Sequence, residues 1–266
     1  VEVPQQAICC GRPLYDFGML NLAKHILWQV IVTMRSQIEA GIPIVGLEPS
    51  CVAVFRDELI NLFPHDQDAK RLSQQTYLLS EFLEKEATDF QVPQLHAKAL
   101  VHGHCHHKAI MKMKDEEKLL SKLGLDFQVL DSGCCGMAGA FGFEQAHYDV
   151  SMKVGERVLL PAVRNAAQDT LIIANGFSCR EQIVQTTERR ALHLAEVLQM
   201  ALHKQTIRPD ETTEASYTQL ATITKANSPS KVAPTLFEKI LLIVVIGMVG
   251  SGIIGWLLQR KKGTRK

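Results

Sequence analysis

The residues of this 266-residue chain whose types and spacing could do chemistry are its seven cysteines and the histidines of one loop. Two cysteines are adjacent in DSGCCGMAGAFGFE, residues 131–144, where a glycine recurs at every third position. A disulfide between neighbouring residues is strained, because disulfides normally span more than the about 3.8 Å between consecutive Cα atoms. Adjacent thiolates are better suited to different corners of one polynuclear centre, such as an iron–sulfur cluster. Gly133, Gly136 and Gly139 would let backbone N–H groups approach the cluster sulfurs.

The paired cysteines belong to a repeat. Cys9-Cys10-Gly11 recurs as Cys134-Cys135-Gly136 at an offset of 125 residues, and Cys51 in EPSC recurs as Cys179 in GFSC at an offset of 128. Two offsets that agree this closely indicate a duplicated unit. A single pair of adjacent cysteines is equally well explained as two small buried hydrophobic residues at a tight turn, but the repeat favours metal binding.

The second unit contains one more cysteine, Cys105, which lies 29 residues before Cys134. Its counterpart in the first unit would fall before residue 1. Residues 1–4, VEVP, have the pattern of a strand, and residue 1 is not methionine. We therefore expect the chain to begin inside the first unit, without that unit's N-terminal strand and helix.

Four histidines surround Cys105 in the stretch HGHCHH: His102, His104, His106 and His107. Imidazole together with thiolate also binds zinc, but the CxxC and HxxxH spacings that are typical of zinc sites do not occur here. Surface and helix-capping positions are the more common use of any single histidine. His104 is the best candidate for a function. It could act as a proton donor, or lie beside the cluster and contact its ligands without binding metal itself.

Apolar runs alternate with amphipathic segments before residue 206. Four runs end in a polar or glycine turn that carries a cysteine: IPIVGLEPSC, HAKALVHGHC, LDFQVLDSGCC and TLIIANGFSC. Helical spacing occurs between them, at residues 19–39, 70–86, 107–123 and 180–202. Strands that alternate with helices predict an α/β fold with mostly parallel sheets flanked by helices. Sites in such sheets lie at the carboxyl ends of the strands, where these cysteines are placed.

The composition is that of a globular protein with an apolar core, since 46% of the residues are hydrophobic. Five of the 29 basic residues lie in the last eight positions, so the remaining 24 are outnumbered by 28 acidic residues and no nucleic-acid partner is expected. So long a chain does not need the disulfide scaffold of a small secreted protein, and a reducing compartment is expected. The glycines at 133–142 do not form a GxGxxG turn, so no NAD or FAD site is expected in this chain.

The C-terminal part has a different character. Residues 207–235 are rich in Thr, Ser and Pro and predict a flexible linker. Residues 240–258 carry no charge and are followed by the basic tail 260–266, which predicts one transmembrane helix within residues 236–259. The basic tail favours a globular domain outside the cell, but cluster assembly and free cysteines favour the cytoplasm. We predict the cytoplasmic orientation.

Six segments resemble a known family: CCGRPLYDFGML, GLEPSCVAVFRDEL, HGHCHHKA, DSGCCGMAGAFGFE, YDVSMKVGERVLLPAV and ANGFSCREQI. They are similar to the cysteine-rich CCG domain of iron–sulfur oxidoreductases, found in heterodisulfide reductase, in lactate-utilisation proteins and in the iron–sulfur subunits of glycolate oxidase and anaerobic glycerol-3-phosphate dehydrogenase. The resemblance is strongest to the C-terminal part of FAD-linked, D-lactate-dehydrogenase-like 2-hydroxyacid oxidoreductases. It implies two duplicated CCG units, residues 1–100 and 101–206.

The resemblance implies that Cys105, Cys134, Cys135 and Cys179 hold one cluster. Cys9, Cys10 and Cys51 would be the remnant or the equivalent of a second site. The family pattern ends in CxxC, whereas Gly176 and Glu48 stand at the first cysteine position of that pattern in the two units. Four cysteines suit a [4Fe–4S] cluster better than the larger centre of the heterodisulfide enzyme.

The resemblance therefore predicts the iron–sulfur electron-transfer module of a membrane-tethered, FAD-linked oxidoreductase. Its substrate would be a 2-hydroxy acid such as lactate or glycolate, or glycerol 3-phosphate. FAD would be bound by a partner flavoprotein or by a domain upstream of residue 1, and a quinone would be a suitable electron acceptor. Two alternatives remain open: a thiol–disulfide reductase that works at the cluster, and a metal-free or zinc-bound module that only anchors partners at the membrane.

Overall fold

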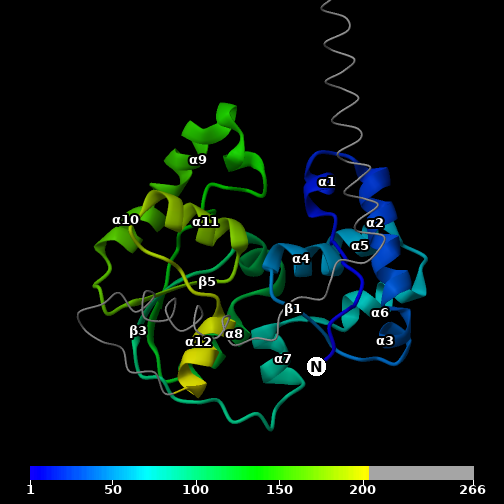
Figure 1. Cartoon of the computed structure of the whole chain (residues 1–266), viewed down its shortest axis with the longest axis horizontal. Coiled ribbons are helices and arrows are strands. Elements are labelled where there is room, and N and C mark those ends of the chain that lie inside the picture. Colours follow the sequence, from blue (N-terminus) through cyan, green and yellow to red (C-terminus); the bar gives the residue numbers. More distant parts are fainter. Residues whose placement is uncertain (204–266) are drawn as a thin grey trace, which may run out of the picture. The chain divides into compact units, whose positions relative to one another are not determined.

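The structure, a computed structural model, describes residues 1–203 of the chain (Figure 1). This part contains two parallel sheets with helices packed against them, which confirms the predicted α/β class. The two-stranded sheet consists of β1 (Ile44–Gly46) and β2 (Thr76–Leu78). The three-stranded sheet has the order β4-β3-β5 and consists of β3 (Lys98–His102), β4 (Asp126–Val129) and β5 (Leu171–Ala174).

Helices connect the strands, as parallel pairing requires. Around the two-stranded sheet they are α1 (Arg12–Asp16), α2 (Leu20–Thr33), α3 (Arg35–Glu39), α4 (Pro49–Ala53), the π-helical turn η1 (Val54–Glu58), α5 (Leu59–Leu62), α6 (Gln67–Gln74) and α7 (Leu79–Lys85). Around the three-stranded sheet they are the π-helical turn η2 (His107–Met111), α8 (Lys114–Lys122), the short turns η3 (Phe141–Phe143) and η4 (Gln145–His147), α9 (Tyr148–Gly155), α10 (Leu159–Asn165), α11 (Phe177–Thr186) and α12 (Leu194–Leu202).

Separate apolar clusters support the two parts. Leu27 and Ile31 of α2 pack with Leu59 of α5 and Leu72 of α6, and all four are almost fully buried. Around the second sheet, the cluster includes some apolar residues from each of β3, β5, α10 and α11, and also the buried cysteines at positions 135 and 179. All four residues of β5 are buried, which explains its unbroken apolar run LIIA. The second cysteine-rich site is therefore built directly on a hydrophobic core.

Several predicted elements differ in detail. The helical segment 70–86 includes β2, because its residues 76–78 pair with β1. The segment 107–123 is divided at Lys112, whose φ of 67° ends η2 before α8 begins. The segment 180–202 is divided between α11 and α12, because Leu192 N donates to Ile172 O and aligns the intervening chain with β5. Helical spacing therefore located these helices but not their breaks.

The strand predicted at residues 1–4 is wrong. These residues are exposed, and in the described part of the chain they pair with no strand. An extended segment forms a strand only when a neighbour accepts its backbone hydrogen bonds. The cysteines at positions 9 and 10 therefore do not follow a strand, unlike those of the second unit.

Within residues 1–203, none of the helices has the length and apolar character needed to cross a membrane. The predicted linker 207–235, transmembrane helix 236–259 and basic tail 260–266 lie outside the described residues. The boundaries of the two CCG units also stay predictions, although β1 and β2 fall in residues 1–100 and the other strands in residues 101–206 apart from the start of β3.

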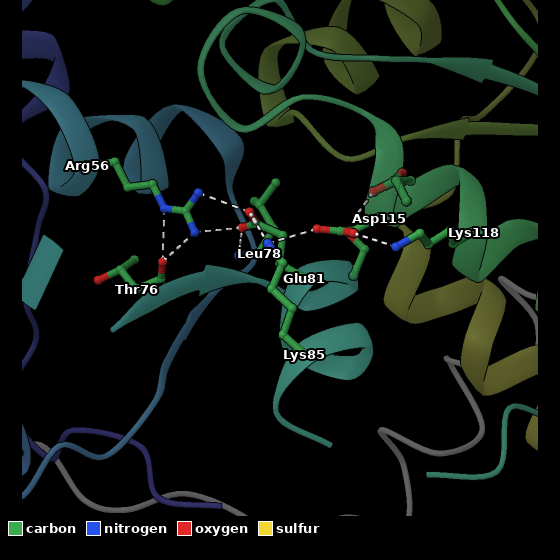
Figure 2. A network of polar contacts seen from close by, with 9 residues as sticks. Arg56, Thr76, Leu78, Glu81, Lys85, Asp115 and Lys118 are labelled. Atoms are coloured by element: carbon green, nitrogen blue, oxygen red, sulfur yellow. Dashed lines mark hydrogen bonds and ion pairs between the residues drawn. The ribbon is translucent and has the colours of Figure 1, made fainter. Parts of the chain in front are cut away.

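A network of charges connects η1 with α7 and α8 (Figure 2). Arg56 makes two hydrogen bonds of 2.9 Å to the Glu81 carboxylate and donates to Thr76 O at 2.8 and 3.0 Å. Lys85 Nζ lies 3.4 Å from Glu81 Oε1 and 2.8 Å from Asp115 Oδ2 on α8. Only 2% of the Glu81 side chain is exposed, so its charge depends mainly on Arg56 for compensation.

We expect Arg56→Met to lower the free energy of unfolding by about 3 to 5 kcal/mol, because the buried Glu81 carboxylate loses its bidentate partner. Lys118→Met is the matched control. Lys118 is 49% exposed, and its ion pair with Asp115 should contribute less than about 1 kcal/mol. Urea denaturation followed by circular dichroism measures both variants. Equal losses in the two variants would contradict the role given to Arg56.

A second buried carboxyl group, Glu116, connects α8 with α7 and with the residue that follows β5. Asn175 Nδ2 donates to both Glu116 oxygens at 2.7 and 2.8 Å, and Ser80 Oγ donates to one of them at 3.3 Å. Burial raises the pKa of Glu116 to about 7, despite these hydrogen bonds. The neighbouring His107 Nδ1 lies 3.9 Å away, and burial lowers the pKa of this imidazole to about 4. The fold therefore favours the neutral form of both groups.

The raised pKa of Glu116 predicts a stability contribution that is complete below about pH 4.5 and is lost as the pH rises to about 7. Glu116→Gln cannot ionise, so across this range the variant should gain up to about 3 kcal/mol relative to the wild type. Burial lowers the pKa of His107 to about 4, so this imidazole stays mostly neutral in the folded protein across the range. Urea denaturation at several pH values measures the difference in free energy of unfolding between variant and wild type. Glu117→Gln, at an exposed position, is the control. A stability difference that does not vary with pH would exclude this effect.

Candidate metal centre

The four cysteines predicted for the second unit meet at the carboxyl edge of the three-stranded sheet. Cys105 follows β3, Cys134 and Cys135 follow β4, and Cys179 lies in the first turn of α11 after β5. Because the three strands are parallel neighbours, the segments that follow them leave the sheet at one edge. The parallel topology therefore brings the segments that follow three strands together at one site.

The four thiols form a continuous series of sulfur contacts. Cys105 is hydrogen-bonded to Cys134, Cys134 to Cys135, and Cys135 to Cys179. All four line a pocket of about 190 Å³, whose walls also include Arg12 of α1. Cys135 and Cys179 are buried, whereas Cys105 and Cys134 are partly exposed. Four soft sulfur donors around one pocket are a ligand set for zinc or for an iron–sulfur cluster.

The acidities of the four thiols alternate along this series. Hydrogen bonds from Cys105 and Cys135 hold the pKa of Cys134 far below its usual range. The hydrogen bond from Cys135 is the largest cause that lowers the pKa of Cys179. The pKa values of Cys105 and Cys135 are raised, because each is hydrogen-bonded to a neighbouring thiolate and is partly desolvated. Hydrogen bonds between neighbouring thiols therefore stabilise the thiolate, the form in which cysteine binds metal.

Gly136 makes the turn that directs the adjacent cysteines into the pocket. Its φ is 104°, and its N–H donates to Cys134 Sγ at 3.3 Å. A Cβ atom at this position would lie 2.2 Å from Ser151 O in α9, so a larger residue requires α9 to move. At Gly136 a backbone N–H thus lies close to a cysteine sulfur, while its approach to the sulfurs of a cluster stays a prediction. Gly139 lines the pocket, and both it and Gly133 have positive φ, while their contact with a bound cluster stays a prediction.

The first unit repeats this local geometry with three thiols. Gly11 has a φ of 74°, and its N–H donates to Cys9 Sγ at 3.4 Å. Cys10 Sγ lies 2.9 Å from Cys51 Sγ in α4. In the second unit, Cys135 contacts Cys179 of α11 in the same way. The hydrogen bond from Cys51 lowers the pKa of Cys10 to about 7. The local structures agree with the repeat, and metal binding by Cys9, Cys10 and Cys51 stays a prediction.

Different groups occupy the position of the absent CxxC cysteine in the two units. Glu48 caps α4 by accepting from Ser50 N at 3.3 Å, and its other carboxylate oxygen accepts from Phe177 N at 2.7 Å. This carboxylate therefore joins the N-terminal ends of the two cysteine-bearing helices, α4 and α11, a role that sequence reasoning missed. At Gly176, a Cβ atom would lie 2.3 Å from Cδ2 of His104, so the His104 ring occupies the space that a cysteine there would need.

The histidine favoured by the sequence does lie beside the thiols. His104 is 7% exposed and lines the pocket. Its Nδ1 accepts from His106 N at 3.2 Å, and His104, Cys105 and His106 have possible metal-binding atoms within 4.8 Å of one another. The position is compatible with contact to a bound group, and the role of His104 as a proton donor stays a prediction.

His102 is the site residue that sequence reasoning left aside. It ends β3 and is 2% exposed. A ring nitrogen lies within 4.8 Å of the sulfurs of Cys135 and Cys179, and its Nδ1 is 2.7 Å from Ser132 Oγ. The signal was present in the sequence, because a histidine that ends a buried apolar strand must find polar partners.

Comparison with known proteins agrees with this geometry. The family model of the cysteine-rich domain (CCG) matches residues 99–184, which include all four second-unit cysteines. Lactate utilization protein A of Bacillus subtilis is 32% identical over 212 residues, which cover 74% of this chain and 85% of that protein. A component of the anaerobic glycerol-3-phosphate dehydrogenase of Escherichia coli is 29% identical over 210 residues, 76% of this chain and 51% of that component. D-2-hydroxyglutarate dehydrogenase of Pseudomonas putida is 26% identical over 190 residues, 71% of this chain and 18% of that enzyme.

The extent of these matches differs among the relatives. The chain spans about half the length of the glycerol-3-phosphate dehydrogenase component and a smaller share of the D-2-hydroxyglutarate dehydrogenase. The match to lactate utilization protein A covers most of both proteins, and the resemblance inferred from the CCG motifs is confirmed. This chain belongs to the family of cysteine-rich CCG-domain proteins that includes lactate utilization protein A.

Proposed function

We propose that this chain is the iron–sulfur electron-transfer module of an oxidoreductase and that Cys105, Cys134, Cys135 and Cys179 hold a [4Fe–4S] cluster. The observation that carries the proposal is the convergence of these four thiols on one pocket at the carboxyl edge of a parallel sheet. When bound there, such a cluster would supply one-electron transfer.

The residues of this chain would control the surroundings of the cluster. Cys135 and Cys179 belong to the apolar core and would fix the position of the buried side of the cluster. Cys105 and Cys134 are partly exposed and would face the side from which electrons enter or leave. The N–H of Gly136 would donate to the sulfur of Cys134 and reduce the negative charge on that ligand.

Metal analysis of the anaerobically purified protein tests the proposal. We expect visible absorbance, with iron and acid-labile sulfide in a ratio of about one to one. Roughly four irons per chain would indicate one cluster, and a clearly larger number would assign a second site to Cys9, Cys10 and Cys51. Stoichiometric zinc without sulfide, or no metal at all, would contradict electron transfer and favour the anchoring module.

We infer that the electrons come from a partner flavoprotein that oxidises a 2-hydroxy acid such as lactate or glycolate, or glycerol 3-phosphate. The names of three relatives, which refer to lactate, glycerol 3-phosphate and D-2-hydroxyglutarate, support this substrate class. Oxidation of each compound by membranes from cells with and without this chain, with an artificial electron acceptor, measures the dependence. Equal oxidation of all of them in the two preparations would contradict the proposed substrates.

We further propose that residues 236–259 tether the module to the membrane and that a quinone accepts the electrons. The support is the charge-free stretch 240–258 with the basic tail that follows it. Recovery of the full chain in the membrane fraction after a carbonate wash tests the tether. Protease added to intact cells tests the orientation, because a domain that faces the cytoplasm should stay intact.

A further inference from the structure

The imidazole of His102 lies at the carboxyl end of the three-stranded sheet, close to the buried thiols. It ends β3, the central strand, and only 2% of the residue is exposed. Its nearest functional neighbours are the sulfurs of Cys135 and Cys179, which lie within 4.8 Å of a ring nitrogen. These are the two most deeply buried of the four predicted ligands.

One nitrogen of this ring is already engaged. Ser132 Oγ lies 2.7 Å from His102 Nδ1, and both side chains are buried. Within residues 1–203, the Ser132 hydroxyl has no other hydrogen-bond partner, so its proton is satisfied only if it donates to Nδ1. A neutral imidazole that accepts at Nδ1 carries its proton at Nε2.

The other nitrogen faces sulfur. Nε2 of His102 is buried and has no hydrogen-bond partner of ordinary geometry in the described part of the chain. Burying an N–H group in an apolar core without a hydrogen-bond acceptor costs free energy, and most buried polar atoms therefore have a hydrogen-bond partner. The sulfurs of Cys135 and Cys179 are the acceptors close to this ring, and of the two Cys179 is the one that interacts with His102.

We propose that His102 is a positioning residue that donates an Nε2–H···S hydrogen bond to the Cys179 ligand, with Ser132 fixing the tautomer. The proposal rests on the proposed function, since it concerns the environment of a cluster held by Cys179. A hydrogen bond to a ligand sulfur stabilises the reduced, more negative state of the cluster more than the oxidised state. His102 would thus raise the reduction potential without binding iron.

Redox titration of the anaerobically purified full-length protein tests this role. In His102→Leu the donor is absent, so the midpoint potential should become more negative while iron and sulfide contents stay at the wild-type level. In His102→Gln the side-chain N–H can reach about the position of Nε2, so the potential should return towards the wild-type value. Ser132→Ala should shift the potential in the same direction as His102→Leu but by less, because only the tautomer control is lost.

Three results would overturn the proposal. An unchanged potential in a fully loaded His102→Leu protein would show that the imidazole does not act on the cluster. Loss of iron from both His102→Leu and His102→Gln, in proteins that retain the wild-type circular dichroism spectrum, would make His102 a ligand instead. Hyperfine coupling of the wild-type cluster to a nitrogen, as strong as that of a directly bonded imidazole, would also make His102 a ligand. A wild-type protein without iron and sulfide would instead refute the proposed function, so the two failures are distinguishable.

Discussion

Cys134→Ser is expected to reduce the iron and acid-labile sulfide of the anaerobically purified protein to near zero, whereas Cys9→Ser should retain most of both. Cys134 lies inside the series of four thiols, where it accepts hydrogen bonds from Cys105 and Cys135 and from the backbone of Gly136. A serine hydroxyl is a harder and far less acidic ligand than a thiol. Cys9 is exposed, and its unit contains only three thiols.

A second matched pair separates ligand loss from misfolding. Cys135→Ser and Cys10→Ser both change a buried cysteine that contacts the cysteine of a following helix. We expect loss of the cluster only in Cys135→Ser, with circular dichroism spectra close to wild type in both. If Cys9→Ser or Cys10→Ser removed the cluster while the changes at 134 and 135 left it intact, the ligand assignment would be reversed.

Gly136→Ala should have the second large effect, a loss of more than about 4 kcal/mol in the free energy of unfolding together with loss of the cluster. Its φ of 104° lies outside the region that alanine adopts without strain, and the added Cβ would lie 2.2 Å from Ser151 O. The opposing atom is helix backbone, so relief requires a shift of α9 and of the turn that carries the two cysteines. Both stability and ligand geometry depend on this one contact.

Gly11→Ala is the control that the repeat itself provides. Gly11 occupies the equivalent position, but its φ is 74° and the nearest atoms to an added Cβ are 3.5 Å away in Ala23. Only the cost of a left-handed conformation remains, about 1 to 2 kcal/mol. Urea denaturation and iron analysis of both variants decide the outcome. Equal destabilisation by the two changes would show that contact with Ser151 is unimportant.

Local patterns predicted the second half of the molecule best. β3, β4 and β5 are continuous or alternating apolar runs that end in a cysteine-bearing turn, and both features depend on residues close in sequence. The segment 70–86 shows the limit of this reasoning. Thr76, Tyr77 and Leu78 form β2 because β1 is available to pair with them, although the flanking residues favour helix.

The sequence by itself indicated the candidate metal ligands: the repeat pointed to the cysteines of both units, and parallel topology implied that those after neighbouring strands would meet. Only the tertiary structure decided the partners of individual side chains. The sulfurs of Cys135 and Cys179 lie near His102, Ser132 holds the other side of that ring, and Glu48 accepts from Phe177 N. Such contacts join residues up to 129 positions apart, and they depend on packing between elements, which no local pattern of residues specifies.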